Sequence, residues 1–188
     1  MALILSGDTG PSIVQTASMP SGSVIQVQQV SQQTRVAVSG DTKIQEINFT
    51  TRALNSKMLI MVSQGLGGFG GYTDYDLALA VGYRIGSSSS TSSDYTAINN
   101  SQYTRQNVTG LGSFFSTDTA DVGGSGGIYY TDEKSYFKLV SPNQAAGTVI
   151  YVSLWGSADN TWYIGSPSGS QSNDGGTEGT ITILEIAG

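Results

Sequence analysis

Short stretches in which apolar and polar residues alternate follow one another along most of the chain. Between residues 24 and 30, and again at 47–50, apolar side chains alternate with glutamine, asparagine or threonine. Strict alternation is typical of a strand with one face in a core and the other in water. No segment keeps a helical repeat over the length of a helix. The pattern therefore predicts an all-β chain.

Other stretches are apolar on both faces. They comprise the continuous run 58–62, the segment 148–155, and the last strand of the chain, which carries Ile181, Ile183, Leu184 and Ile186. Such a strand must be covered twice. For the last strand, a central place in a sandwich and a subunit interface would each provide that cover.

A strand at 77–85 has one face of larger residues and one face of small residues. The small face consists of Ala78, Ala80 and Gly82. Because these side chains occupy little space, another sheet or subunit can approach closely. Further short strands are predicted at 35–38, 137–139 and 162–164.

Turn residues divide the chain into an arm and a domain. The cluster Ser6 to Pro11 and the cluster Met19 to Gly22 enclose a segment that the turn chemistry predicts to be extended. We expect residues 1–20 to form an N-terminal arm and residues 21–188 to form one domain. Many short strands joined by Gly-rich and Ser-rich turns favour an antiparallel sandwich or jelly roll. Long polar loops, which in compact domains are usually functional or disordered, are predicted at 87–101, 116–133 and 166–179, and the serine tract of the first could be flexible filler.

Composition excludes several classes of function. The 188 residues include only eight Lys plus Arg, and the formal net charge is −6, so neutralisation of nucleic-acid phosphates is not expected. The absence of Cys and His removes disulfides, the usual zinc ligands and His-based catalysis. No apolar run approaches the length of a membrane span. The first residues lack the basic and long apolar regions of a signal peptide, so we expect the protein to stay in the cytosol where it is made.

Several motifs resemble catalytic or metal-binding signatures without their context. Asp8-Thr9-Gly10 matches half of an aspartic-protease site. The Gly-rich run 65–70 matches the G-x-G-x-x-G dinucleotide-binding pattern, but an alternating strand follows it in place of the helix that this pattern requires. Asp74 with Asp76, and Asp132 with Glu133, could bind Ca²⁺ in a loop but are interpreted as solvated carboxylates. We predict no enzyme activity, no cofactor and no metal. A polysaccharide-degrading enzyme stays an alternative, since two carboxylates alone can cleave sugars.

Aromatic residues near the loops are candidates for binding. Tyrosine supplies rigid contact area at low entropic cost and is common in binding surfaces rich in Ser, Gly and Asn. The possible receptor contacts are Tyr95, Tyr103, Tyr129 and Tyr130. A carbohydrate-binding or host-receptor-binding adhesin is therefore the second functional hypothesis.

The two ends of the chain resemble a known group of proteins. The opening Met-Ala-Leu-Ile-Leu-Ser-Gly-Asp-Thr-Gly-Pro and the following Met19 to Val27 resemble the start of tail-fibre-like and virion proteins of marine bacteriophages. The ending Gly179-Thr-Ile-Thr-Ile-Leu-Glu-Ile-Ala-Gly188 resembles the last strand of phage proteins with a C1q/TNF-type jelly roll. Between them, 137–142, 149–155 and 162–164 fall where that family places its late strands.

The resemblance implies a homotrimer attached to a virion through its N-terminal segments, with its loops facing outward. The chain would then be a capsid decoration, a head fibre or a tail-fibre module, assembled in the bacterial host cytoplasm with capsid or tail proteins as partners. Its loops could contact a host glycan. Particle docking is assigned to the apolar arm residues Leu3, Ile4, Leu5, Ile13 and Val14, which need burial outside the domain. The trimer interface is assigned to Ile181, Ile183 and Ile186.

Overall fold

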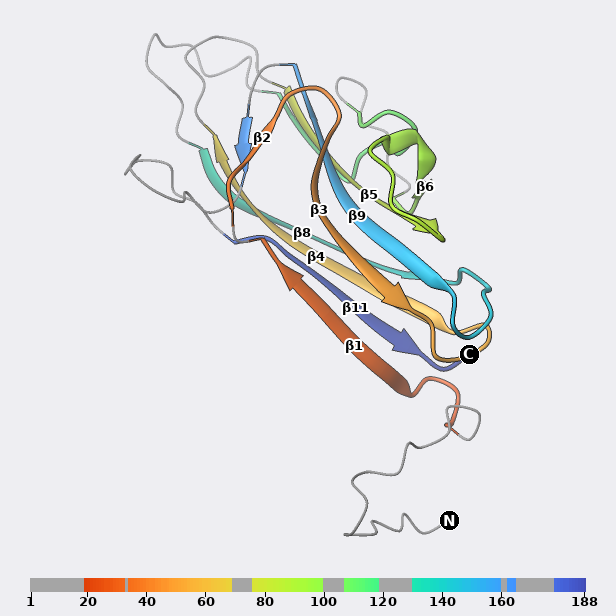
Figure 1. Ribbon diagram of the computed structural model, residues 1–188. Helices are drawn as coiled ribbons and strands as arrows, with labels where there is room; N and C mark the ends of the chain where they lie inside the picture. Colours follow the sequence, from red (N-terminus) through yellow and green to blue (C-terminus); the bar gives the residue numbers. More distant parts are fainter. Residues whose placement is uncertain are drawn as a thin grey trace, which may run out of the picture.

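The protein consists of two antiparallel β-sheets packed face to face (Figure 1). The computed structural model describes residues 19–32, 34–68, 76–99, 107–118, 130–159, 162–164 and 178–188. Among these residues the helical content is a single 3₁₀ turn, η2 (Ser92–Asp94). The all-β prediction is therefore confirmed, and the layered sheets are those of a β-sandwich.

The last strand of the chain is an interior strand of sheet A. The order of this sheet is β1-β11-β4-β10-β2, and β8 also pairs with β4. The bounds are β1 (Val24–Ser31), β2 (Val36–Val38), β4 (Lys57–Gly68), β8 (Tyr130–Val140), β10 (Trp162–Ile164) and β11 (Thr180–Ile186). In Figure 1, β11 runs between β1 and β4. An interior place in the sheet thus accounts for much of its apolar character.

Sheet B faces sheet A with the order β3-β9-β5-β6, and β7 also pairs with β5. The bounds are β3 (Thr42–Thr50), β5 (Asp76–Ile85), β6 (Thr96–Ala97), β7 (Phe115–Asp118) and β9 (Val149–Ala158). Strand β9 is the central strand and is buried on both faces, as the sequence indicates. Most neighbours in both sheets are far apart in sequence, so long-range pairing builds the fold.

The main core lies between the sheets. On β4, Met58, Ile60 and Val62 are buried and meet inward residues of sheet B such as Val152 and Leu154. Apolar burial of this kind stabilises a fold by about 25 cal/mol per Å². Alternate residues of each strand therefore fix which face of the sheet turns inward.

Three local features depart from the sequence-based expectation. Strand β3 begins at Thr42, earlier than the alternation at 47–50 indicates, because a β-bulge between Lys43 and Gln45 interrupts the alternation. Strand β8 begins at Tyr130, inside the predicted loop 116–133. Strand β4 extends to Gly68, so the first part of the Gly-rich run is strand.

Candidate functional site

The outer face of sheet A carries an uninterrupted apolar row across four strands. The register places Val27 of β1 opposite Leu184 of β11, Leu184 opposite Leu59 of β4, and Leu59 opposite Leu139 of β8. Val27 is 59% exposed and Leu139 is 49% exposed. Sheet B covers the opposite face of these strands, so the row faces away from the core.

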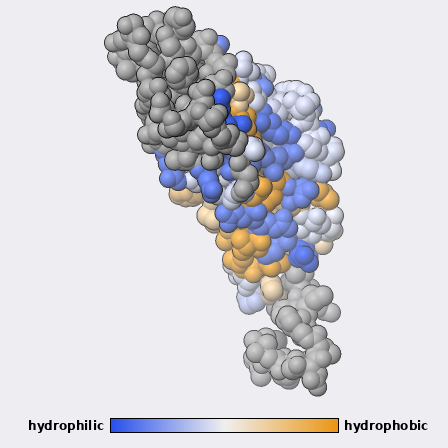
Figure 2. All heavy atoms as spheres, turned by 60° about the vertical axis from the view of Figure 1, so that its left-hand side comes forward, coloured by the Kyte–Doolittle hydropathy of each residue, from blue (hydrophilic) through white to orange (hydrophobic). Residues whose placement is uncertain are grey.

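Neighbouring rows extend this surface. Met61 pairs with Phe137, whose side chain is 75% exposed, and Ile186 pairs with Val24, which is 48% exposed. The apolar face, as we call it, comprises Val24, Val27, Leu59, Met61, Phe137, Leu139, Leu184 and Ile186. Figure 2, which brings the left-hand side of Figure 1 forward, shows apolar surface in the lower part of this side with polar surface beside it.

The apolar face is almost free of charge. Lys57 lies beside Ile186 at one end, and Glu133 lies beside Gly65 at the other. The paired rows between them are uncharged, and the last of these joins Thr180, Ser63 and Ser135. Single exposed apolar residues are ordinary, but a contiguous apolar surface without charge is typical of a protein–protein contact.

The residues assigned from sequence to a trimer interface lie on both sides of β11. Ile181 and Ile183 are fully buried in the core between the sheets, within the single chain. Ile186 is half-buried and belongs to the apolar face. A contact through this strand would therefore use Ile186 and its alternate neighbour Leu184.

The other assigned site residues are only partly within the described structure. Leu3, Ile4, Leu5, Ile13 and Val14 lie outside the described residues, as do Tyr103 and Tyr129. Tyr130 is the first residue of β8, and its side chain is not described. Tyr95 is only 4% exposed, and its hydroxyl is occupied by hydrogen bonds within the chain. Its position gives it a packing role.

Tyr95 belongs to a layer of loops that covers the outer face of sheet B. This loop layer comprises residues 86–99 and 107–114, and its apolar centre joins Tyr95, Val108 and Leu111 to Ala80 and Trp155. A Cβ atom on Gly82 would come within 2.8 Å of Leu111 Cδ2. The small-residue face of β5 therefore admits the chain's own loops.

The serine tract, for which flexible filler is one interpretation of the sequence, is held by a half-buried polar cluster around Glu46. The Glu46 carboxylate accepts hydrogen bonds from Ser88 Oγ and Ser153 Oγ at 2.5 Å and from Lys43 Nζ at 2.9 Å. The Tyr95 hydroxyl also donates to Glu46, at 2.5 Å, and accepts from the Ser89 N–H. These contacts fasten the tract to β3 and β9.

A second carboxylate fastens the same layer at its other end. Asp41 Oδ2 accepts hydrogen bonds from Ser92 Oγ at 3.0 Å and from the Thr109 N–H at 2.9 Å. Burial raises the pKa of Asp41, but hydrogen bonds from Thr109, Ser157 and Ser92 outweigh it and hold this pKa below its ordinary value. Burial likewise raises the pKa of Glu46, and the hydrogen bonds that it accepts lower it by more.

Acidification is expected to loosen the loop layer. Because the pKa values of Glu46 and Asp41 are lowered in the folded state, their stabilisation is present above the ordinary values of 4.5 and 3.8 and is lost as the pH falls through the lowered values. The variant Glu46→Gln should have a lower thermal midpoint than the wild type at neutral pH. The two midpoints should converge in strong acid.

Thermal unfolding followed by circular dichroism across the acid range measures this difference. The near-ultraviolet signal reports the layer directly, because the Tyr95 and Trp155 rings meet edge to face with centroids 5.5 Å apart. Glu178→Gln, at an exposed acidic position of the described chain, makes the same change of net charge and is the control. A constant difference in midpoint between Glu46→Gln and the wild type at every pH would contradict the assigned role.

A buried carboxylate closes the opposite end of the sandwich. Glu185 of β11 is fully buried, and its oxygens accept the Arg52 N–H at 2.8 Å and the Ala53 N–H at 3.1 Å. Gln26 Nε2 donates to it at 2.7 Å. Glu185 was not predicted from the sequence, although a single charged residue in an otherwise uncharged strand was the available signal.

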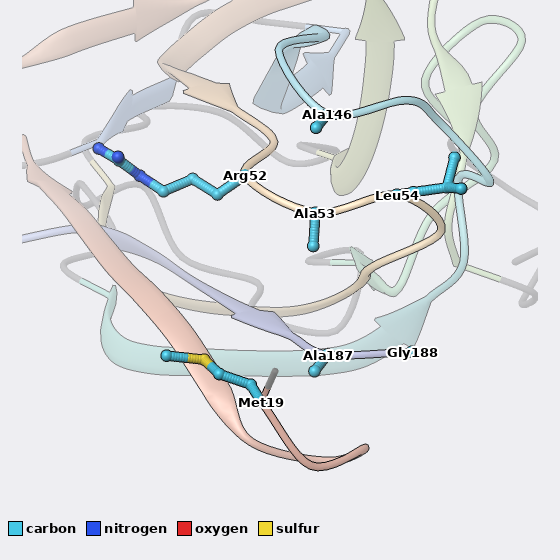
Figure 3. Close-up of a pocket in the computed structure, with 7 residues that line it drawn as sticks. All are labelled: Met19, Arg52, Ala53, Leu54, Ala146, Ala187 and Gly188. Atoms are coloured by element: carbon cyan, nitrogen blue, oxygen red, sulfur yellow. The ribbon is translucent and has the colours of Figure 1, made fainter. Parts of the chain in front are cut away.

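A hollow of about 410 Å³ is lined in part by Arg52 and Ala53, whose N–H groups bind this carboxylate; Figure 3 shows its lining residues. It is lined by Met19, Arg52, Ala53, Leu54, Ala146, Ala187 and Gly188. Figure 3 shows the Arg52 side chain extending away from the other lining residues. The lining residues include neither Asp nor Glu, so the hollow lacks the pair of carboxylates that sugar cleavage requires.

Comparison with known proteins adds no assignment. No protein-family model matches the chain, and no curated protein matches it in sequence. Within the described ranges, acidic side chains do not gather in a group of three or more that could hold a metal ion. The described part of the chain also contains no helix long and apolar enough to cross a membrane.

Proposed function

We propose that the chain is a non-enzymatic structural protein of a bacteriophage virion that self-associates through the apolar face. In this proposal it is a trimeric capsid decoration, head fibre or tail-fibre module. The observation that carries the self-association is the apolar row from Val27 to Leu139, which is exposed in the single chain. Burial of this row against other copies would remove apolar area from water.

The strand orders support a jelly roll as the finer description of the sandwich. The run β1-β11-β4-β8 in sheet A joins the first and last strands of the domain, and β3-β9-β5-β7 lies opposite. Nearly all of these neighbours are far apart in the sequence, as Greek-key connections require. This arrangement agrees with the resemblance of the chain's ending to C1q/TNF-type domains.

The virion assignment depends on the resemblance of both ends of the sequence to phage proteins. In this scheme the arm, residues 1–20, attaches the protein to its particle, and three arms would act with avidity. Strand β1 begins four residues after the arm, beyond a turn in which the Ser23 N–H donates to the Pro20 carbonyl at 3.1 Å. This turn precedes β1, and in the proposal the domain, residues 21–188, forms its core without the arm.

A version starting at Ser21 is expected to fold and to trimerise but not to attach to particles that lack the protein. Light scattering gives the mass of both versions, and cryo-electron microscopy of incubated particles gives the occupancy. The full chain is the control and should decorate the particles. A full chain that is monomeric at micromolar concentration would contradict the trimer. Full decoration by the shortened version would contradict the role of the arm.

A further inference from the structure

Strand β1 has one edge to which no described strand pairs. It stands at the end of the order of sheet A, next to β11 alone. The Gln32 N–H donates to the Gly179 carbonyl at 2.7 Å, which places residue 32 in a hydrogen-bonded pair with residue 179. In an antiparallel ladder the backbone N–H and C=O groups of every second residue point toward the same neighbouring strand, so those of residues 28, 30 and 32 point toward β11. The N–H and C=O groups of Val27, Gln29 and Ser31 therefore face the open edge.

A β-bulge interrupts β1 between Val24 and Gln26, but the regular part of the strand beyond it, residues 27–31, has no such protection of its edge. The eight residues of β1, VIQVQQVS, include no charge, no proline and no glycine. Natural proteins usually protect an edge strand with charges, proline or short length. The other described edge strands follow that rule. Strands β2, β6 and β7 are short. The longer edge strands are charged: β3 carries Lys43 and Glu46, and β8 carries Glu133, Lys134 and Lys138. Strand β1 is the exception among them.

We propose that the open edge of β1 pairs antiparallel with β1 of a second copy of this chain. Without charge on either edge, self-pairing meets no electrostatic repulsion, which β3 or β8 would meet at many registers. The two-fold axis passes through Gln29, so that Val27 of each copy lies opposite Ser31 of the other. This register uses every described edge-facing group and forms roughly six hydrogen bonds. Sheet A then continues from one copy into the next.

This contact is separate from the apolar face. The face is formed by side chains on one surface of sheet A, whereas the edge is formed by backbone groups at its border. Edge pairing would therefore join two units, whether each unit is a trimer or a single chain. A contact of this size is small compared with a standard protein–protein interface, so we expect association that depends on concentration. Because the edge is uncharged, ionic strength should have little effect on it.

Sedimentation velocity of the full chain over a wide range of concentrations tests the pairing. The wild type should form a species of twice the unit mass as concentration rises. Gln29→Pro removes an N–H that faces the open edge and not β11, so the pairing with β11 is kept. The dissociation constant of the Gln29→Pro variant for edge pairing should be roughly 10- to 100-fold higher than that of the wild type, because the two-fold axis removes this hydrogen bond twice.

Two further variants keep the test decisive if proline lowers expression. Gln29→Lys places two like charges at the axis and should weaken the step similarly, whereas Gln29→Ala retains the backbone groups and should not. Equal association of Gln29→Lys and the wild type would overturn the proposal. Loss of the step in the version starting at Ser21 would also overturn it, since the arm would then be the occupant. If a variant changes the mass of the unit but the unit still doubles with concentration, the variant has altered the contact through the apolar face and the edge pairing stands.

Discussion

Aspartate at position 183 is expected to prevent folding, whereas aspartate at the adjacent position 184 is expected to leave the fold intact and to abolish assembly. Ile183 is fully buried in the core, and the half-buried Leu184 lies on the apolar face. Truncation of a buried isoleucine alone costs about 2–5 kcal/mol. An unpaired buried carboxylate adds several kcal/mol. The sum is comparable to the whole stability of a domain, about 5–15 kcal/mol.

Denaturant unfolding and light scattering separate the two outcomes. Ile183→Asp should give no cooperative transition. Leu184→Asp should unfold within about 1 kcal/mol of the wild type but run as a monomer, because a charge on the apolar face opposes its burial in a contact. Leu184→Met conserves volume and should behave as the wild type. A folded Ile183→Asp protein would contradict the core position of Ile183, and a Leu184→Asp protein of unchanged mass would contradict assembly through the apolar face.

Removal of the buried carboxylate in Glu185→Ala is expected to lower the free energy of unfolding by about 3–5 kcal/mol. The Arg52 and Ala53 N–H groups and Gln26 Nε2 would each lose the acceptor that the fully buried Glu185 carboxylate provides. Hydrogen bonds to a charged group contribute about 1.5–3 kcal/mol each, and they are not additive. The connection between β3 and β4, which these bonds hold, should loosen first.

Chemical denaturation measures the loss, and hydrogen exchange at the Arg52 and Ala53 amides locates it. Glu185→Gln retains one acceptor oxygen and the shape of the side chain, so it should fall between Glu185→Ala and the wild type. Glu178→Ala, at an exposed acidic position of the described chain, is the control for net charge. A fully stable Glu185→Ala protein with protected amides would contradict the assigned role.

Alternation of apolar and polar residues by itself determined the β class and most strands. Ile47 and Phe49 are inward residues of β3, as their spacing indicates, and β9 is covered on both faces, as its continuous apolar run indicates. These elements were predictable because period-two alternation acts locally, within a single strand. The apolar run of the last strand was also visible, and its interior place in sheet A was one of two arrangements that it allowed.

The tertiary structure decided what covers each face. The sequence does not distinguish Ile183, which meets the opposite sheet, from Leu184, which lies on the apolar face, because both are apolar and only the register of β11 against β1 and β4 separates them. The Glu46 cluster was hidden for a similar reason. Lys43 is close to Glu46 in sequence, but the donors Ser88, Tyr95 and Ser153 come from distant parts of the chain, and only the stacking of β3, β9 and the loop layer brings them together.

Residue type and spacing therefore determined the strands of this protein, because strand formation depends on neighbours along the chain. Pairing partners, strand edges and the fate of buried charges were decided by contacts between residues far apart in sequence. Glu185 illustrates the difference. In the sequence it is one acid in an apolar strand, and in the structure its carboxylate satisfies backbone N–H groups more than a hundred residues away.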